Sequence, residues 1–458
     1  MRAYSTTPIQ ERIANLKAAS ELGKDGSLEM EDDEQENDDV ATEVESMPAK
    51  PSNPVFSDNL NLGKIGEDDR FTYMSVDSLY GKYSSASKDQ MKITDNFSIP
   101  VQLINRVVFW YHVYTTFTRD DYIIHIGEYP EVILEVAELK ASDNMGFGEY
   151  RTARKDLKDR VEDYVSILED LQDYEPNTEL SETEKRICGL MAHINDKDKY
   201  AKAAASIRVQ LGQGDYIEEG FQESLPYLPA VKDAFKKMSL PEELVGIAYV
   251  ESSFNIKAVS NVGASGVFQF MPYVGRHYMI VNHNIDERRD PIKSASAAAQ
   301  LLWENFDALK SWPLAITAYN HGASGIKRGV SETGSSDIET LVQNYHNRRF
   351  GFASKNYYTE FLAMLVVVKQ FEEAMNSDDE VPPLSYAEHK IGKPESIQSI
   401  LKRFGTDKDS LMALNPDLSK DFVLKNGMLP RNYIVKVPVP ELTAMTDDEK
   451  SSGDKTKF

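Results

Sequence analysis

Glu251 is the residue of this chain best suited to chemistry, because its carboxyl group falls on the apolar face of a predicted helix. The inward-facing positions of residues 241–252 follow the spacing i, i+3, i+4, i+7: Leu244, Ile247, Ala248 and Glu251. A carboxyl group on such a face is desolvated, and desolvation raises its pKa. A carboxylic acid that stays protonated near neutral pH can give a proton to a leaving group, as the general acid of a glycosidase does.

A second carboxylate is missing from the neighbourhood of Glu251 in the sequence. No Asp or Glu occurs in the 34 positions after it, until Asp286. A glycosidase of the two-carboxylate kind needs a nucleophile or a base besides its acid. Asp286 and Asp290 stay candidates for that second acid. Arg288 lies between them and a proline follows Asp290, so we expect both to serve in ion pairing and helix capping instead.

Two further segments supply polar groups without charge. Residues 263–272 combine glycines, which allow close backbone approach, with Gln269, and residues 317–322 carry the pair Tyr319 and Asn320. Tyr and Asn each donate and accept hydrogen bonds, so they suit a site that reads hydroxyl and acetamido groups. No His/Cys/Asp cluster with metal spacing and no phosphate-cradling loop occurs, so we expect no metal site and no cofactor.

As a set, these motifs resemble those of a known enzyme family. Glu251-Ser252, Gly266-Val-Phe-Gln269 and Ala318-Tyr-Asn320 stand in the order and spacing of the family-1 lytic transglycosylases (SLT domain). The chain is similar to the membrane-bound lytic murein transglycosylase D type over residues 208–369, including residues 225–229, 240–244, 286–291, 312–322 and 350–362. Two local departures are Val-Phe in place of the more usual Leu-Met before Gln269, and His321 after the Tyr–Asn pair.

The resemblance implies a mainly α-helical, lysozyme-like fold and a reaction on peptidoglycan. Such an enzyme cleaves the β-1,4 bond between N-acetylmuramic acid and N-acetylglucosamine without water. Glu251 would protonate the glycosidic oxygen and then take the proton of the muramoyl C6 hydroxyl, which closes a 1,6-anhydro ring. Two alternatives stay open: a hydrolytic muramidase of lysozyme type, and a catalytically inactive peptidoglycan-binding scaffold.

The resemblance also implies roles for the residues around Glu251. Asn320 would position the acetamido group, and the late Tyr that lies near the catalytic Glu falls at Tyr357, with Tyr358 adjacent. The residues implied to bind substrate are Ser252, Gln269, Tyr319, Asn320 and Tyr357.

The C-terminal part has a resemblance of its own. Residues 386–439 give a strand signal, two helical signals and a second strand signal, and are similar to lysin-motif (LysM) domains. That βααβ fold binds glycans containing N-acetylglucosamine. The usual Gly-Asp-Thr after the first strand is replaced here by Gly392-Lys393-Pro394, so the fold is expected and glycan binding stays open.

Composition limits the partners and the location. The net charge of the 458 residues is −23, yet residues 226–370 carry 15 Lys/Arg against 13 Asp/Glu, while residues 29–45 hold ten acidic residues and no basic one. The sequence has no basic patch interleaved with aromatic residues, so we expect no nucleic-acid partner. No apolar run is long enough to span a membrane, no signal peptide or lipobox is visible, and the single Cys188 excludes an internal disulfide.

We therefore expect a monomer of five segments that acts on peptidoglycan glycan strands. Because of that substrate, it would work outside the cytoplasm, in the periplasm, associated with the cell envelope, or secreted. The helical N-terminal extension could dock protein partners. The segments are an acidic disordered region (1–69), the helical N-terminal extension (70–225), a lysozyme-like transglycosylase domain (226–375), a LysM-like domain (384–440) and a flexible tail (441–458).

Overall fold

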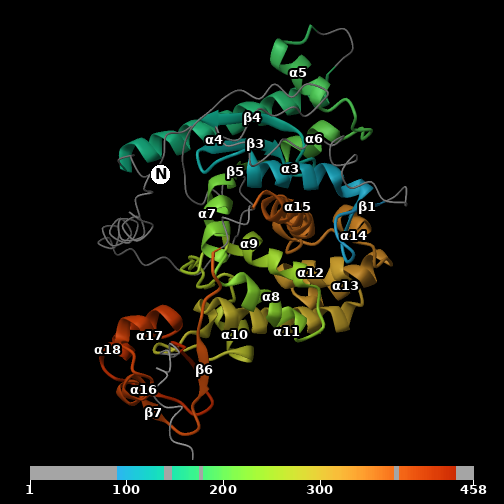
Figure 1. Ribbon diagram of the computed structural model, residues 1–458. Helices are drawn as coiled ribbons and strands as arrows, with labels where there is room; N and C mark the ends of the chain where they lie inside the picture. Colours follow the sequence, from blue (N-terminus) through green and yellow to red (C-terminus); the bar gives the residue numbers. More distant parts are fainter. Residues whose placement is uncertain (1–89, 139–146, 175–178, 376–380, 440–458) are drawn as a thin grey trace, which may run out of the picture. The chain divides into compact units, whose positions relative to one another are not determined.

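The computed structural model describes residues 90–138, 147–174, 179–375 and 381–439 (Figure 1). Within these ranges, residues 112–214 form one compact unit, and residues 90–111 together with 215–439 form a second. The segments expected to be disordered or flexible, 1–69 and 441–458, lie outside the described residues.

The first unit is built on a three-stranded antiparallel sheet in the order β4-β3-β5. Its elements are β3 (Asp121–Ile126), β4 (Ile133–Glu138), α4 (Phe147–Gln172), α5 (Glu182–Leu190), α6 (Lys199–Ala204) and β5 (Ile207–Leu211). Helix α4 packs on α6 and β5, and buries Leu157 and Leu168 in the same core as Ile124. The prediction of helices alone was wrong for this unit, although β3 is rich in the aromatic and β-branched residues that favour strands.

The second unit is mainly helical, as predicted. Its elements before residue 376 are β1 (Gln90–Lys92), β2 (Ser98–Pro100), η1 (Val101–Leu103), α3 (Ile104–Thr115, which continues into the first unit), α7 (Gly214–Ser224), α8 (Leu228–Lys236), η3 (Glu242–Val245), α9 (Gly246–Ser252), α10 (Pro272–Tyr278), η4 (Glu287–Arg289), α11 (Pro291–Leu309), α12 (Trp312–His321), α13 (Ala323–Thr333), α14 (Ile338–Asn344) and α15 (Phe352–Ala374). Helix α15 is buried along most of its length and contacts both α9 and α12 (Figure 1). These three helices carry the Glu251, Tyr–Asn and late Tyr motifs, so packing of the core brings the motifs together.

The predicted start of α11 is confirmed. The Asp290 side chain accepts hydrogen bonds from the backbone N–H groups of Ile292 and Lys293, and Pro291 occupies the first helical position. A proline is tolerated there because its missing N–H would have no partner within the helix. Asp290 therefore has the capping role that the sequence predicts.

Residues 384–439, called the C-terminal module below, contain two small sheets and three helices. They are β6 (Ala387–Lys390), β7 (Glu395–Ser396), α16 (Ile397–Phe404), α17 (Lys408–Leu414), α18 (Lys420–Leu424), β8 (Met428–Leu429) and β9 (Ile434–Val437). Strand β6 pairs antiparallel with β9, and β7 with β8. The order β6, α16, α17, β9 agrees with the expected βααβ pattern, to which α18 and the β7–β8 pair are added.

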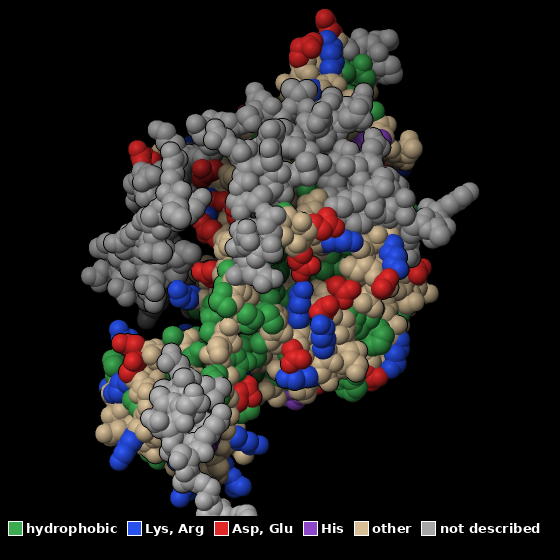
Figure 2. All heavy atoms as spheres, viewed as in Figure 1, with side chains coloured by type: hydrophobic (Ala, Val, Ile, Leu, Met, Phe, Trp, Pro, Cys, Tyr) green, Lys and Arg blue, Asp and Glu red, His purple; other side chains and the backbone are tan. Residues whose placement is uncertain are grey.

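The mixed surface charge of the second unit and the lengths of the described helices agree with what the composition predicts. Figure 2 shows Lys and Arg side chains interspersed with Asp and Glu side chains over the described part of the second unit on the visible face. Of the helices in the described ranges, none combines the length and apolar character that crossing a bilayer requires.

Candidate active site

Glu251 lies in the last turn of the short helix α9. The sequence predicts one helix over residues 241–252, whereas the structure begins with the 3-10 turn η3 and continues as α9. Leu244, Ile247 and Ala248 are fully buried, so the predicted apolar face does point into the core. Glu251 itself is half-buried at the end of that face.

The helix ends abruptly just after Glu251. Ser253 and Phe254 both adopt left-handed backbone conformations, with φ of 51° and 58°, which is uncommon for residues other than glycine. The turn packs so closely on α7 that a Cβ on Gly220 would overlap the Ser253 carbonyl oxygen. This close approach fixes the end of α9 and with it the position of the Glu251 carboxyl group.

The Glu251 carboxyl group contacts a tyrosine of α15. The Tyr357 hydroxyl donates a hydrogen bond to Glu251 Oε1 at 2.5 Å. Burial raises the pKa of Glu251 to about 7, and the hydrogen bond from Tyr357 opposes that rise. Protein atoms surround the carboxyl group densely, although part of the side chain keeps access to solvent. A group in this position is desolvated and can still be reached by a substrate.

Two stacked tyrosines flank the carboxyl group. The rings of Tyr319 and Tyr357 are nearly parallel, at 10°, with centroids 6.4 Å apart. Burial, reinforced by the charge of Glu251, raises the pKa of both tyrosines well above the ordinary value. Both hydroxyls therefore stay protonated and act as donors: Tyr357 to Glu251, and Tyr319 to the carbonyl oxygen of Phe268 at 2.9 Å.

The Phe268 carbonyl belongs to the glycine-rich loop, residues 263–270, which carries Gln269. Gly266 has φ of +76°, and a Cβ there would overlap the Arg288 carbonyl oxygen, so only glycine fits. Gln269 also has a positive φ, 45°, and its Nε2 donates to the Gly266 carbonyl at 2.8 Å. Its amide is thus held within the loop.

Ser252 connects α9 to the same loop. Its hydroxyl lies 3.1 Å from the Ala248 carbonyl oxygen and 3.0 Å from that of Val267. A hydroxyl has one proton, so these two acceptors share it. Ser252 therefore braces the loop against the helix, and its role toward substrate stays a prediction.

Asn320 is exposed at the end of α12 and is held by Ser354, which was not among the predicted site residues. Ser354 Oγ donates to Asn320 Oδ1 at 2.9 Å, and His321 Nδ1 lies 3.1 Å from the same Oγ. Because the one proton of Ser354 goes to Asn320, His321 Nδ1 must be the donor in the second contact. Burial lowers the pKa of His321, which favours this neutral imidazole. Ser354 stands within the 350–362 motif, which was the signal available for it.

The two candidate second acids are engaged elsewhere. The Asp286 carboxylate binds the Arg288 guanidinium through both oxygens, at 2.9 and 2.8 Å, and Asp290 caps α11 and pairs with Lys436. The predicted ion pairing and capping are thus confirmed. In the described parts of the chain, no three His, Cys, Asp or Glu side chains are grouped so that they could hold a metal ion.

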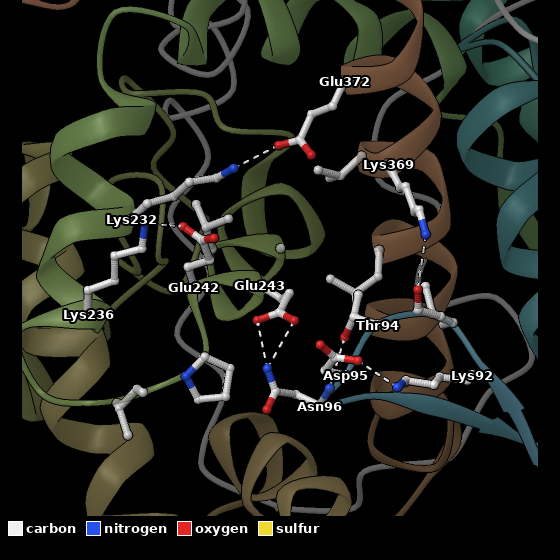
Figure 3. A pocket seen from close by; sticks show the side chains of 17 residues that line it. Lys92, Thr94, Asp95, Asn96, Lys232, Lys236, Glu242, Glu243, Lys369 and Glu372 are labelled. Atoms are coloured by element: carbon white, nitrogen blue, oxygen red, sulfur yellow. Dashed lines mark hydrogen bonds and ion pairs between the residues drawn. The ribbon is translucent and has the colours of Figure 1, made fainter.

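A cavity of about 900 Å³ lies elsewhere in the second unit (Figure 3). It is lined by Lys and acidic side chains of β1, α8, η3 and α15, and none of the six predicted site residues is among them. Its charges largely satisfy one another: Lys232 pairs with Glu372, Lys236 with Glu242 and Lys92 with Asp95. The candidate active site is therefore the cluster around Glu251 and not this cavity.

Part of the chain that carries these residues is similar to known proteins. Residues 229–342 match the family model of the transglycosylase SLT domain. The membrane-bound lytic murein transglycosylase D of Escherichia coli (strain K12) is 28% identical over 263 residues, which are 52% of this chain and 57% of that protein. The membrane-bound lytic murein transglycosylase C of Actinobacillus succinogenes is 31% identical over 125 residues, 23% of this chain and 34% of that protein.

The chain thus spans little more than half of the length of the first of these relatives and a third of the second. The solved structure of the 70 kDa soluble lytic transglycosylase SLT70 from Escherichia coli aligns at 19% identity with a TM-score of 0.29, over 51% of this chain and 38% of that one. The sequence matched by the family model contains Glu251, Gln269 and the Tyr–Asn pair. The chain therefore contains a transglycosylase SLT domain, the family that its three motifs resemble.

Proposed function

We propose that this protein is a peptidoglycan lytic transglycosylase, with residues 226–375 as the catalytic domain and Glu251 as the acid and then the base. One observation carries the proposal: a single half-buried carboxyl group, with a pKa of about 7, receives a hydrogen bond from Tyr357. Its pKa is set by burial and by that hydrogen bond, and no other carboxylate of the described residues contributes. A carboxyl group with a pKa near neutral pH can donate a proton in one step and accept a proton in the next.

The geometry suggests how the two steps are divided between the carboxyl oxygens. Tyr357 donates to Oε1, so the proton of the neutral acid resides on Oε2 and faces the glycosidic oxygen. After that proton is transferred, the Tyr357 hydrogen bond stabilises the carboxylate. The carboxylate then takes the proton of the muramoyl C6 hydroxyl, and the C6 oxygen closes the 1,6-anhydro ring. The substrate's acetamido group, oriented by the Asn320 amide, would stabilise the positively charged sugar ring in between.

The two carboxylates considered for the hydrolytic alternative are engaged elsewhere. Asp286 is occupied by Arg288, and Asp290 is buried under Lys436 at the start of α11. A base that activates water would have to be free of such partners. This arrangement supports the transglycosylase over a muramidase.

Several wider features belong to the same proposal. Glycan strands of peptidoglycan are the substrate, Ser252, Gln269 and Tyr319 line the cleft, and no cofactor takes part. The C-terminal module is LysM-like and helps to retain glycan, while the N-terminal extension docks protein partners. The protein acts as a monomer at the cell envelope, in the periplasm or after secretion. The murein substrate and membrane association named for the similar Escherichia coli protein support this location.

The test is mass spectrometry of the soluble products that the purified protein releases from isolated sacculi. The wild type should release muropeptides one water lighter than their reducing counterparts, and Glu251→Gln should release none. Glu332→Gln, the same substitution at an exposed position of α13, is the matched control and should resemble the wild type. Reducing-end products would establish a muramidase instead, and the absence of products from the wild type would favour the inactive scaffold.

A further inference from the structure

The C-terminal module is joined to the catalytic domain by main-chain contacts. They include a β-bridge of Ile285 with Leu418, a 2.8 Å hydrogen bond from Asp286 N–H to the Asp417 carbonyl, and one of 2.9 Å from Ser419 N–H to the Asn284 carbonyl. Ile285 is 3% exposed and belongs to the hydrophobic core of the module. A segment of the catalytic domain thus completes the core of its neighbour.

Buried charges of opposite sign fix this contact in one position. Lys436 of β9 is 1% exposed and pairs with Asp290 at the start of α11, which is 0% exposed. In the other direction, Lys293 of α11 binds Asp417 of the module at 2.7 Å. Separating the two parts by even a few ångströms would leave these charges unpaired in a medium of low dielectric constant, so a displaced arrangement is strongly disfavoured.

Arg288 connects this contact to the glycine-rich loop. Its guanidinium is 7% exposed and binds both oxygens of Asp286, the residue whose N–H donates to the Asp417 carbonyl. The same side chain donates through Nη1 to the carbonyl oxygens of Gly263 and Phe270, each at 2.8 Å. One buried cation therefore holds both ends of the loop.

The loop in turn supports the residues at Glu251. The Phe268 carbonyl accepts the hydrogen bond of Tyr319, whose ring stacks on Tyr357, the donor to Glu251. Ser252 lies 3.0 Å from the Val267 carbonyl of the same loop. A shift of the loop would thus move the hydrogen-bond acceptor of one tyrosine and loosen the enclosure of the acid.

We propose that the docked C-terminal module, acting through Asp286 and the positioning residue Arg288, holds the glycine-rich loop in its catalytic geometry. The module is then a fixed support of the active site in addition to any glycan binding. This inference rests on the proposed transglycosylase function. Undocking should lower kcat more than it raises KM, because loop displacement disturbs the acid itself. It should also move the basic limb of the pH–rate profile to lower pH, because a looser enclosure admits water to Glu251.

The experiment uses the full chain and three variants. Lys436→Met leaves Asp290 without its cation, Arg288→Lys keeps the charge but loses the fork that binds two partners, and Lys425→Met is the matched control on the exposed surface of the module. The first two should lower kcat by about tenfold to a hundredfold, the range expected for misplaced catalytic groups. The control should equal the wild type in kcat and in its pH profile.

A rescue variant separates positioning from loss of folding. Asp290→Asn combined with Lys436→Met removes both charges and keeps a helix-capping side chain, so kcat and the pH limb should return toward wild type. Rates are expressed per folded protein, measured by circular dichroism. Wild-type kcat and pH profile in the folded fraction of Lys436→Met would overturn the inference.

Hydrogen exchange of residues 263–270 gives a readout that does not depend on activity. In Lys436→Met, the backbone amide protons of this loop should exchange faster than in the wild type or in Lys425→Met. Unchanged protection would overturn the inference even if the enzyme is active. An inactive wild type with the expected loop exchange would instead refute the proposed function and leave the support of the loop standing.

Discussion

Replacing Tyr357 by Phe removes the hydroxyl that donates to Glu251 Oε1 at 2.5 Å and keeps the ring that stacks on Tyr319. A hydrogen bond to a charged group contributes about 1.5–3 kcal/mol. The lower end applies here because part of the Glu251 side chain is open to solvent. Since about 1.4 kcal/mol corresponds to one pKa unit, the pKa of Glu251 should rise by about one unit from its value of about 7.

This rise has two kinetic consequences with different signs. The protonated acid persists to higher pH, so the basic limb of kcat/KM should move up by about one pH unit. The carboxylate formed by proton transfer loses the same stabilisation, so the maximal rate should fall by about tenfold. Both follow from initial rates of 1,6-anhydro product release, followed by liquid chromatography and mass spectrometry between about pH 5 and pH 9.

The neighbouring tyrosine provides a matched control. Tyr358 is also buried in α15, but its ring stacks on Phe361. Tyr358→Phe should leave the position of the basic limb unchanged. The reasoning is refuted if Tyr357→Phe keeps the wild-type limb, or if both variants shift it equally.

Three further outcomes are expected. Burial raises the pKa of folded Glu251 from 4.5 to about 7, so its contribution to stability is present below pH 4.5 and is lost as the pH rises toward 7. At pH 8, Glu251→Gln should therefore have a free energy of unfolding in urea that is higher than that of the wild type by roughly 2–3 kcal/mol. At pH 4 the two proteins should differ little. An equal gain at both pH values would contradict this. Gly220→Ala should lower the free energy of unfolding in urea by about 1–3 kcal/mol or more, because the added Cβ overlaps the Ser253 carbonyl. Gly148→Ala, which has open space around the added carbon, should not lower it. Ser354→Ala should raise KM about fivefold with a smaller change in kcat, since Asn320 loses a neutral hydrogen bond of about 1 kcal/mol. A decrease in kcat with unchanged KM would contradict a substrate-binding role of Asn320.

The sequence predicts features that are local along the chain. The apolar face with Glu251 and the cap at Asp290 each depend on spacing within a few turns, and each appears in the structure. The composition of β3 was a strand signal that was overlooked, whereas its pairing with β5, some 80 residues away, could not be predicted from local spacing. Strand pairing is decided by such distant neighbours, which leave no periodic signal of their own.

Contacts between distant residues account for the rest of what was missed. Lys436 and Asp290 are 146 positions apart, and neither residue type nor spacing indicates their pairing. The sequence places Asp286 beside Arg288 and so predicts their ion pair, but not that the arginine reaches Gly263 and Phe270. Likewise, spacing does not indicate that the Ser252 hydroxyl lies near two carbonyl groups of the backbone, and its expected contact with substrate stays a prediction.

The burial of the ion pairs under the C-terminal module determines how the protein responds to salt. The side chains of Lys425 and Asp421 on the module surface are 75% and 71% exposed, so dissolved ions screen their attraction. Those of Lys436 and Asp290 are 2% and 0% exposed, and ions cannot enter between them. The module should therefore remain docked in about 1 M salt, where the screening length is about 3 Å. At the cell envelope, the location proposed above, ionic strength follows the surroundings, and the protein would keep its active-site geometry through osmotic changes that weaken surface ion pairs.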